Sequence, residues 1–580
     1  MILQALARYY DDLLQQGKIS APGWTKVKIS YALDIGLDGQ LKQVIPTRQD
    51  ETVGKKTVQR PQEMVLPAPV KKASNISSNF LWENSGYLLG VKQKEDSKRS
   101  RKCFDNAREL HHRLLDSVDS SIAKAILAFF DRWQPENAAE HPALVGQLEE
   151  VTAGANLVFW VDGTYPQEDM LIRETWEHAQ NQEDRDATRM QCLITGREDE
   201  IAKIHPSIKG VRDAQSSGAA LVSFNAPAFC SYGHEQNYNA PVGKHAAFAY
   251  TAALNHLLSD RNSVQHIGDT TVVCWAEGAE EAYQNLAQFA LFGQEMPGLT
   301  DNDLRAALKR LANGLPCDDL GVDPKRPFYV LGLAPNAARL SVRFFLHDSF
   351  GKLMKNVNDH YDRMEIVRPS FDKQEILPLW WMLRETVNLN SRDKAPSPAM
   401  AGATVRAVFS GGPYPASLLE AVMLRIRAES SVTRGRAAII KAYYLKNPHS
   451  DCPKEVLTVS LNEANNNPAY ILGRLFSVYE AVQQSANPGI NTTIKDKYFN
   501  SAAAMPASIF PVLNNLYQKH LRKLAPGLRI SYDKQVMELK GALGENYPAR
   551  MTLAQQGAFD LGYYHQTQRR YTKKEDQNNG

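Results

Sequence analysis

The chain has 580 residues, of which 43% are hydrophobic and 23% charged, and its formal net charge is +3. These values are ordinary for a globular protein of two or more domains, and the sequence holds neither a fixed repeat nor a low-complexity tract. No window approaches the roughly 18 uncharged apolar residues of a membrane span, and the opening MILQALARYYDDLL lacks the regions of a signal peptide, so we expect no membrane partner.

The first part of the chain predicts a mixture of helix and strand. Residues 2–16 carry apolar side chains at helical spacing. Residues 25–35 alternate like a half-buried strand, and residues 37–45 continue it, with Asp38-Gly39 as the signal of a hairpin turn. Residues 46–80 contain four prolines and no sustained period, which predicts a long loop or a segment that passes from disorder to order.

Farther along, apolar runs of strand length alternate irregularly with helical patterns. Strands are predicted over 157–163, 220–224, 270–276 and 327–335. Helices are predicted over 103–131, 244–258, 279–291 and 301–313. This order lacks the regular βα alternation of a doubly wound sheet.

After about residue 415 the pattern becomes helical. Segments with i, i+3, i+4 apolar spacing, separated by short Pro, Gly or Asn breaks, cover 418–429, 471–486, 506–524, 533–543 and 551–571. The last nine residues are expected to form a frayed tail. The sequence therefore predicts an α+β fold, in which a mixed α/β N-terminal lobe at residues 1–455 precedes an all-α C-terminal helical bundle at residues 456–580.

The cysteines are scattered, and no two are spaced as a CxxC pair. They are residues 103, 192, 230, 274, 317 and 452. This usage predicts reduced thiols in a cytoplasmic protein and neither a disulfide framework nor a zinc ribbon.

Basic residues gather in two distant regions. Residues 40–102 hold thirteen Lys and Arg against six acids, and residues 461–580 hold fourteen against nine. Two such regions fit a polyanion that contacts the protein in two places, although solvated surfaces have the same composition.

The sequence contains no recognised catalytic or phosphate-binding motif. The SxxK patterns at Ser121 and Ser349 are short enough to arise by chance. The histidines at 245 and 256 are about three helical turns apart, too far to share a metal ion. Cys192 lies in an apolar run, which favours a buried thiol over a nucleophile paired with His205. We expect no catalytic residue, metal or cofactor.

One loop, SFNAPAFCSYGHEQNYNAPVG at residues 223–243, is rich in neutral amides. Amide side chains both donate and accept, so they can pair with base edges without the unselective attraction of a charge. The candidate base readers are Asn225, Gln236, Asn237 and Asn239. The aromatic residues Phe224, Phe229, Tyr232 and Tyr238 could wedge or stack at an opened base step.

A second candidate segment, KKASNISSNFLWENSGYLLG, covers residues 71–90. Lys71 and Lys72 suit phosphates, and Asn75, Ser77 and Asn79 supply short polar groups. Trp82 and Tyr87 are expected to anchor the segment in the core. In both segments Asn, Ser and Gly are also the residues that ordinary turns use.

Several passages resemble the large subunit of the type I-C CRISPR Cascade complex, the family called Csd-one or Cas-eight-c. They occur in the family's order over nearly the whole chain. They are NFLWENSGYLLG (79–90), CLITGREDEIAKIHPSIKGV (192–211), SSGAALVSFNAPAFCSYGHEQNYNAPVGKHAAFAYTAALNHLL (216–258), FYVLGLAPNAARLSVRFF (328–345), SGGPYPASLLEAVMLRIRAE (410–429) and the stretch from NPAYILGRLF to QKHLRKL (467–524). Trp82-Glu83 departs from the Cys-Asp-like pair that we would expect there.

The resemblance implies a subunit that needs no catalytic residues. Such subunits cap the foot of a complex built on CRISPR RNA, recognise the protospacer-adjacent motif (PAM) of double-stranded target DNA, help to separate its strands into an R-loop, and help to recruit a helicase-nuclease. Base pairing with the guide then reads the remaining sequence. Related subunits read the motif largely from the minor groove, where small amides fit.

The resemblance also gives the C-terminal bundle a role. In this family it is similar to the separate helical small subunit, which lines the displaced strand and the heteroduplex, and it can be made again from an internal start. The implied partners are CRISPR RNA, target DNA, the Cascade backbone and foot-capping subunits, helical small subunits and the helicase-nuclease. The side chains expected at phosphates are Lys495, Lys497, Lys519, Arg522, Lys523, Arg529 and Arg569.

Two alternative functions stay open. One is a CRISPR RNA-processing endoribonuclease that uses His205 or His234 as a general acid and base. The other is an RNA-binding scaffold that does not recognise a DNA motif.

Overall fold

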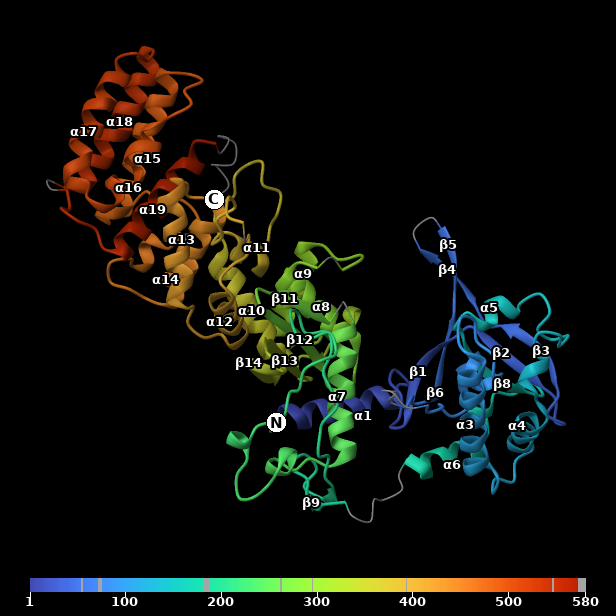
Figure 1. The fold of residues 1–580 in the computed structure, drawn as a ribbon. Helices are drawn as coiled ribbons and strands as arrows, with labels where there is room; N and C mark the ends of the chain where they lie inside the picture. The colour runs from blue at the N-terminus through green and yellow to red at the C-terminus, as the bar shows by residue number, and fades with distance from the viewer. Residues whose placement is uncertain are drawn as a thin grey trace. The chain divides into compact units, whose positions relative to one another are not determined.

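The computed structural model describes most of the chain (Figure 1). The described residues are 1–53, 56–70, 76–180, 187–260, 263–294, 296–392, 394–544 and 547–571. They form two compact units, one mainly from residues 3–205 and 224–253 and the other mainly from residues 206–223 and 254–580. None of the helices in these ranges is both long enough and apolar enough to span a bilayer.

The first unit combines short sheets with helices. Its strands are β1 (Trp24–Ile29), β2 (Tyr31–Ile35), β3 (Leu41–Pro46), β4 (Gln49–Val53), β5 (Lys56–Arg60), β6 (Gln62–Pro67), β7 (Trp82–Asn84), β8 (Asn156–Val161), β9 (Arg189–Gln191) and β10 (Glu198–Glu200). Its helices include α1 (Ile2–Gln15), α2 (Ser85–Leu88), α3 (Ser97–Leu115), α4 (Ser121–Arg132), α5 (Leu148–Thr152) and α6 (Met170–Gln180). The helix α7 (Lys244–Ser259) begins in this unit.

A four-stranded sheet in the order β3-β2-β8-β7 forms the centre of this unit. Its middle strands β2 and β8 run parallel, and β3 and β7 pair antiparallel at the edges. The rings of Phe129 and Phe130 on α4 pack edge-on against Phe159 of β8, so α4 covers this part of the sheet. The predicted Asp-Gly turn is confirmed: Gly39 has a φ of +79°, and β2 and β3 pair on either side of it.

Two expectations about this sheet region are wrong. The single strand predicted over 25–35 is divided at Ser30, and β1 pairs with β6 while β2 joins the central sheet. The loop predicted over 46–80 contains β4, β5 and β6. Its prolines mark strand ends, since Pro46 and Pro67 are the last residues of β3 and β6 and Pro61 separates β5 from β6.

The helix predicted over 103–131 is two helices. Ser120 accepts hydrogen bonds at its Oγ from the backbone N–H of Ile122 and Ala123, at 3.1 and 3.3 Å, and so caps the start of α4. The apolar period continues through this break, and for that reason it did not reveal the turn between α3 and α4.

The second unit begins with an antiparallel sheet in the order β11-β12-β13-β14. Its strands are β11 (Val264–Ile267), β12 (Thr270–Ala276), β13 (Pro327–Asn336) and β14 (Arg339–Ser349). The strands predicted at 270–276 and 327–335 are thus confirmed. The strand predicted over 220–224 is wrong, because Ala220 forms a single bridge with Arg339 and no ladder follows.

The rest of this unit is helical. Its helices are α8 (Glu281–Phe292), α9 (Asp301–Ala312), α10 (Phe350–Met364), α11 (Leu379–Arg384), α12 (Pro398–Ser410), α13 (Ala416–Glu429), α14 (Arg434–Lys446), α15 (Pro468–Ala486), α16 (Ile494–Ala504), α17 (Pro506–Leu521), α18 (Pro526–Leu543) and α19 (Leu553–Arg569). The α+β class is therefore confirmed, with strands in the N-terminal part and mostly helices toward the C-terminus. Helical packing already starts at Phe350, and one buried core continues from α10 to α19. The division at 455/456 stays a prediction.

Helix α15 is the axis of the C-terminal helices. Every residue from Ala469 to Val482 is buried, so neighbours surround the helix on all sides. Its closest neighbour is α19. A Cβ on Gly473 would lie 1.9 Å from the carbonyl oxygen of Phe559, and one on Gly562 would lie 2.1 Å from that of Tyr470. Glycine at both positions allows the two backbones to touch.

Candidate nucleic-acid interface

The amide-rich loop lies between the β9–β10 hairpin and α7. It contains two single turns of 3-10 helix, Pro227–Phe229 and Gln236–Asn239. Its second half is attached to the hairpin region, because the N–H of Ala202 donates to the carbonyl of Val242 and the N–H of Leu193 donates to the carbonyl of Pro241, both at 2.9 Å.

Asn239 holds the loop closed. Its Oδ1 accepts from the backbone N–H of Ser231 at 2.7 Å. Its Nδ2 donates to the carbonyls of His234 and Gln236 at 2.9 and 2.8 Å. The side-chain amide thus forms its hydrogen bonds within the loop itself, which is the role of an Asn in a turn.

The closed loop presents aromatic residues at its tip. Tyr232 is 98% exposed and has a φ of +54°, a left-handed conformation that bulky residues rarely adopt. Phe229 is 43% exposed on the preceding turn. A strained, fully exposed aromatic on a pinned loop is an arrangement that functional sites use.

The other amides of the loop differ in exposure. Asn225 is exposed and Gln236 is half-buried. Asn237 is only 3% exposed, and its N–H reaches the carbonyl of Lys203 at 3.4 Å. The buried side-chain oxygens of Gln236 and Asn237 have no hydrogen-bond partner within the part of the chain that is described.

Only part of the second candidate segment can be placed. Lys71, Lys72 and Asn75 lie outside the described residues. Ser77 is half-buried. Asn79 is 3% exposed, and its Oδ1 accepts from the N–H of Val70 at 3.0 Å, so this amide also serves the fold.

Trp82 and Tyr87 anchor this segment, as expected. Both side chains are buried, and Trp82 Nε1 donates to the carbonyl of Pro67 at 2.8 Å. Burial raises the pKa of Tyr87 to about 12, with a smaller contribution from Cys103, so the phenol is neutral. Glu83, the second residue of the departing pair, is also buried.

Six of the seven predicted bundle cations lie where α15 ends. This α15-end basic surface consists of Lys495, Lys497, Lys519, Arg522, Lys523 and Arg529. All except the half-buried Lys495 are exposed. Asn487, which caps the C-terminus of α15, contacts the residues at the end of α17. Its Oδ1 accepts from Lys523 Nζ at 3.3 Å, and its Nδ2 lies 3.2 Å from His520 Nδ1.

The N-terminus of α16 is attached to the same end. Thr493 Oγ1 donates to Glu480 Oε1 at 2.9 Å, and Gln483 Oε1 accepts from the N–H of Ile494 at 2.7 Å. Arg569 is the seventh cation, and it does not join this group. Its Nη2 lies 3.3 Å from Glu463 Oε1.

The histidines proposed for catalysis are in different settings. His205 is 5% exposed, and its Nδ1 lies 2.7 Å from the Tyr250 hydroxyl. Burial lowers the pKa of His205 to about 4, so the ring is neutral and inside the core. His234 is exposed. The described residues contain no group of three His, Cys, Asp or Glu side chains that could hold a metal ion.

Two comparisons with known proteins bear on this interface. The sequence matches the family model of "CRISPR-associated protein (Cas_Csd1)" over residues 6–571, nearly the whole chain. No curated protein matches it.

Proposed function

The chain belongs to the Cas_Csd1 family of CRISPR-associated proteins and is a subunit of a Cascade complex, and from this premise we propose that it reads the PAM of double-stranded DNA. In this role the chain opens the duplex beside the motif, promotes R-loop formation and helps to recruit the helicase-nuclease. Base pairing with the guide RNA reads the rest of the target. The chain itself performs no catalysis.

The closed loop with Tyr232 at its tip is the observation that carries this proposal. Asn239 fixes the backbone between Ser231 and Gln236, so Tyr232 and the amide of Gln236 meet DNA in a set arrangement, and the exposed Asn225 precedes them in the same loop. Tyr232 stacks on or wedges into the first opened base step, and the amides pair with base edges in the minor groove. Lys71 and Lys72 contact phosphates, and Asn75 and Ser77 lie close to them in the sequence.

The α15-end basic surface supports the proposed role in R-loop formation. A single strand displaced from the duplex carries one phosphate per nucleotide, and six cations at one end of a helical bundle suit such a strand. Lys497 also lies 5.2 Å from the centre of the Tyr498 ring, which places an aromatic surface beside a cation.

The experiment uses the assembled complex and duplexes that carry every trinucleotide at the PAM position. The wild type is compared with variants in the proposed readers, Asn75→Ala, Asn225→Ala and Gln236→Ala, and with Tyr232→Ala. The reader variants are expected to lose discrimination between trinucleotides. Tyr232→Ala is expected to keep discrimination and to slow strand opening, measured by the fluorescence of 2-aminopurine beside the motif. Asn79→Ala and Asn237→Ala are compared separately, because both side chains are buried.

The same experiment separates the alternatives. A wild-type complex that does not distinguish trinucleotides would support the scaffold, and discrimination that survives all the reader variants would refute these residue assignments. Incubating the chain with precursor CRISPR RNA tests the endoribonuclease, since cleavage that His234→Ala abolishes would contradict a non-catalytic subunit.

A further inference from the structure

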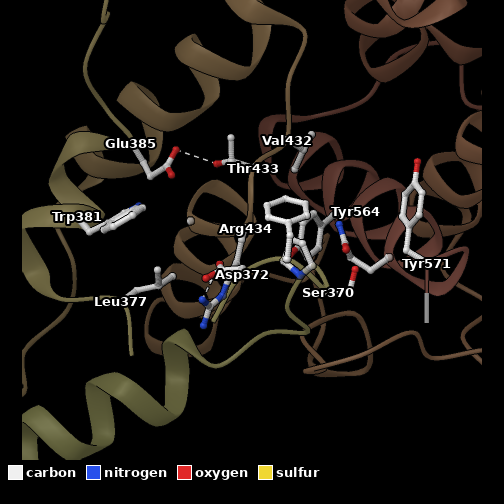
Figure 2. A pocket seen from close by; sticks show the side chains of 14 residues that line it. Ser370, Asp372, Leu377, Trp381, Glu385, Val432, Thr433, Arg434, Tyr564 and Tyr571 are labelled. Atoms are coloured by element: carbon white, nitrogen blue, oxygen red, sulfur yellow. Dashed lines mark hydrogen bonds and ion pairs between the residues drawn. The ribbon is translucent and has the colours of Figure 1, made fainter. Parts of the chain in front are cut away.

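A pocket of about 610 Å³ lies in the second unit. Figure 2 shows that its walls come from the segment before α11, from Trp381 and Glu385 in and just after α11, from the start of α14 and from the end of α19. Trp381, Tyr564 and Tyr571 face it together with Leu377 and Val432. Its volume is within the range of pockets that bind ligands.

The charges on the pocket walls are already paired. Arg434 donates to Asp372 Oδ2 at 2.8 Å and to the carbonyls of Gln374 and Glu375 at 2.6 and 2.9 Å. Glu385 accepts from the Thr433 hydroxyl at 2.8 Å. Arg436 does not line the pocket, and its Nε lies 3.4 Å from Glu385 Oε2.

One donor is left over. Arg434 is 9% exposed, and its Nε is buried with no hydrogen-bond partner among the described residues. Buried donors are almost always paired in native proteins. This nitrogen is closed off from solvent, so it lies inside the wall and adds no binding group to the pocket surface.

The apolar surface continues outside the pocket. Phe371 at the mouth is 85% exposed, and Tyr571 is 58% exposed. Trp380, whose ring centre lies 5.4 Å from that of Trp381, is 44% exposed. Large exposed aromatics beside a pocket are typical of protein–protein contact sites.

These features discriminate between the possible occupants. Arg434 is the only cation among the wall residues described, and its side chain, at 8% exposed, is less exposed than the side chains of Asp372 at 24% and Glu385 at 15%. Inside the pocket a nucleic-acid strand would meet these carboxylates. Arg570, whose guanidinium lies 5.6 Å from the centre of the Tyr571 ring, already donates to Gln484 Oε1 at 3.2 Å. A small molecule inside the pocket would leave Phe371 in water, whereas a protein segment would cover both.

We propose that this pocket is a docking site for a protein partner, which inserts an aromatic side chain beside Trp381 and Tyr564. The inserted segment carries no net negative charge, because the carboxylates of Asp372 and Glu385 are the more exposed charges of the wall. Phe371 and Tyr571 close over the segment and exclude water from the contact.

The test uses the full chain and three small probes, followed by saturation-transfer NMR. N-acetyltryptophanamide supplies an indole and amide carbonyls, N-acetylalaninamide lacks the aromatic ring, and adenosine represents a nucleobase. We expect saturable binding of the tryptophan probe alone. Val432→Trp, which fills the pocket, should abolish this binding, and Phe371→Ala should weaken it about fivefold or more. Leu424→Ala, at a site that is 58% exposed on α13, is the matched control and should leave it unchanged.

Each other outcome contradicts the proposal. It is refuted if the wild type does not bind the tryptophan probe, or if both pocket variants bind it as well as Leu424→Ala does. Equal binding of the alanine probe would show that no aromatic side chain is selected. Binding of adenosine that Val432→Trp abolishes would reassign the pocket to a nucleobase. Because Phe371 is almost fully exposed, Phe371→Ala remains informative even if Val432→Trp does not fold.

Discussion

Asn239 is the residue on which the shape of the proposed DNA-reading loop depends. Asn239→Ala removes three hydrogen bonds, each worth about 0.5–1.5 kcal/mol, that tie Asn239 to Ser231, His234 and Gln236 around the loop tip. We expect chymotrypsin to cut after Tyr232 several-fold faster in this variant, with the melting temperature nearly unchanged. Ser231→Ala, which keeps the backbone N–H, is the control. Equal cleavage rates in the two variants would show that Asn239 does not close the loop.

The residue types in this loop could be predicted from the sequence, but their tasks could not. An Asn that reads a base and an Asn that closes a turn have the same side chain, and only tertiary structure separates Asn225, which is exposed, from Asn79 and Asn237, which are buried. The signal for Asn239 was its position a few residues after a Gly-containing tip. No local pattern indicated that Arg434 would leave a buried donor unpaired.

The crossing of α15 and α19 depends on two glycines. An Ala at Gly473 or Gly562 would place a methyl group about 2 Å from a backbone carbonyl of the opposite helix, so the helices must move apart. We expect each substitution to destabilise the second unit by about 1–3 kcal/mol, measured by urea denaturation. Gly541→Ala on α18 is the control, because a Cβ there meets no atom within 4 Å, and it should stabilise by about 0.5–1 kcal/mol. A neutral Gly473→Ala would contradict this close packing.

The α15-end basic surface predicts the salt dependence of DNA binding. Each phosphate contact that is lost should reduce the slope of log K against log salt by about 1. Lys523→Gln and Arg529→Gln are therefore expected to flatten the slope for the assembled complex on target DNA. Arg569→Gln should change it less, because Arg569 is already paired with Glu463. Equal changes in all three variants would remove the distinction between this surface and the rest of the bundle.

Regular elements were predicted where one periodic pattern covers a whole element, as in β12 and α7. The predictions failed where pairing with a distant segment determines whether a strand forms and which sheet it joins. The apolar run at 25–35 carries no mark of the change of sheet at Ser30, and the polar residues of β4 to β6 form strands by pairing with each other and with β1. Helix α15 is buried on all sides, polar residues such as Arg474 and Glu480 included, and this burial follows from the helices that surround it.

The protein as a whole keeps four histidines in its interior, two in each unit. Burial lowers the pKa of His111 and His205 to about 4, and that of His360 and His565 to about 3, from 6.5. His111 is fixed as the neutral ring, since its Nδ1 donates to the carbonyl of Ala107 and its Nε2 accepts from the N–H of Leu81. Protonation is therefore much easier in the unfolded chain than in the folded one.

This difference sets how stability changes with pH. Above pH 6.5 neither state binds the protons, so the free energy of unfolding is at its full value. As the pH falls from 6.5 toward 4, the unfolded chain binds protons that the folded chain does not bind. Each buried histidine therefore lowers the free energy of unfolding by up to about 1.4 kcal/mol per pH unit. Urea denaturation between pH 8 and pH 5 should show this loss. His111→Gln, whose amide can keep both hydrogen bonds, should reduce the slope of the free energy of unfolding against pH for the first unit. Replacing the exposed His234 by Gln should leave that slope unchanged. Equal slopes in the wild type and His111→Gln would contradict the assignment.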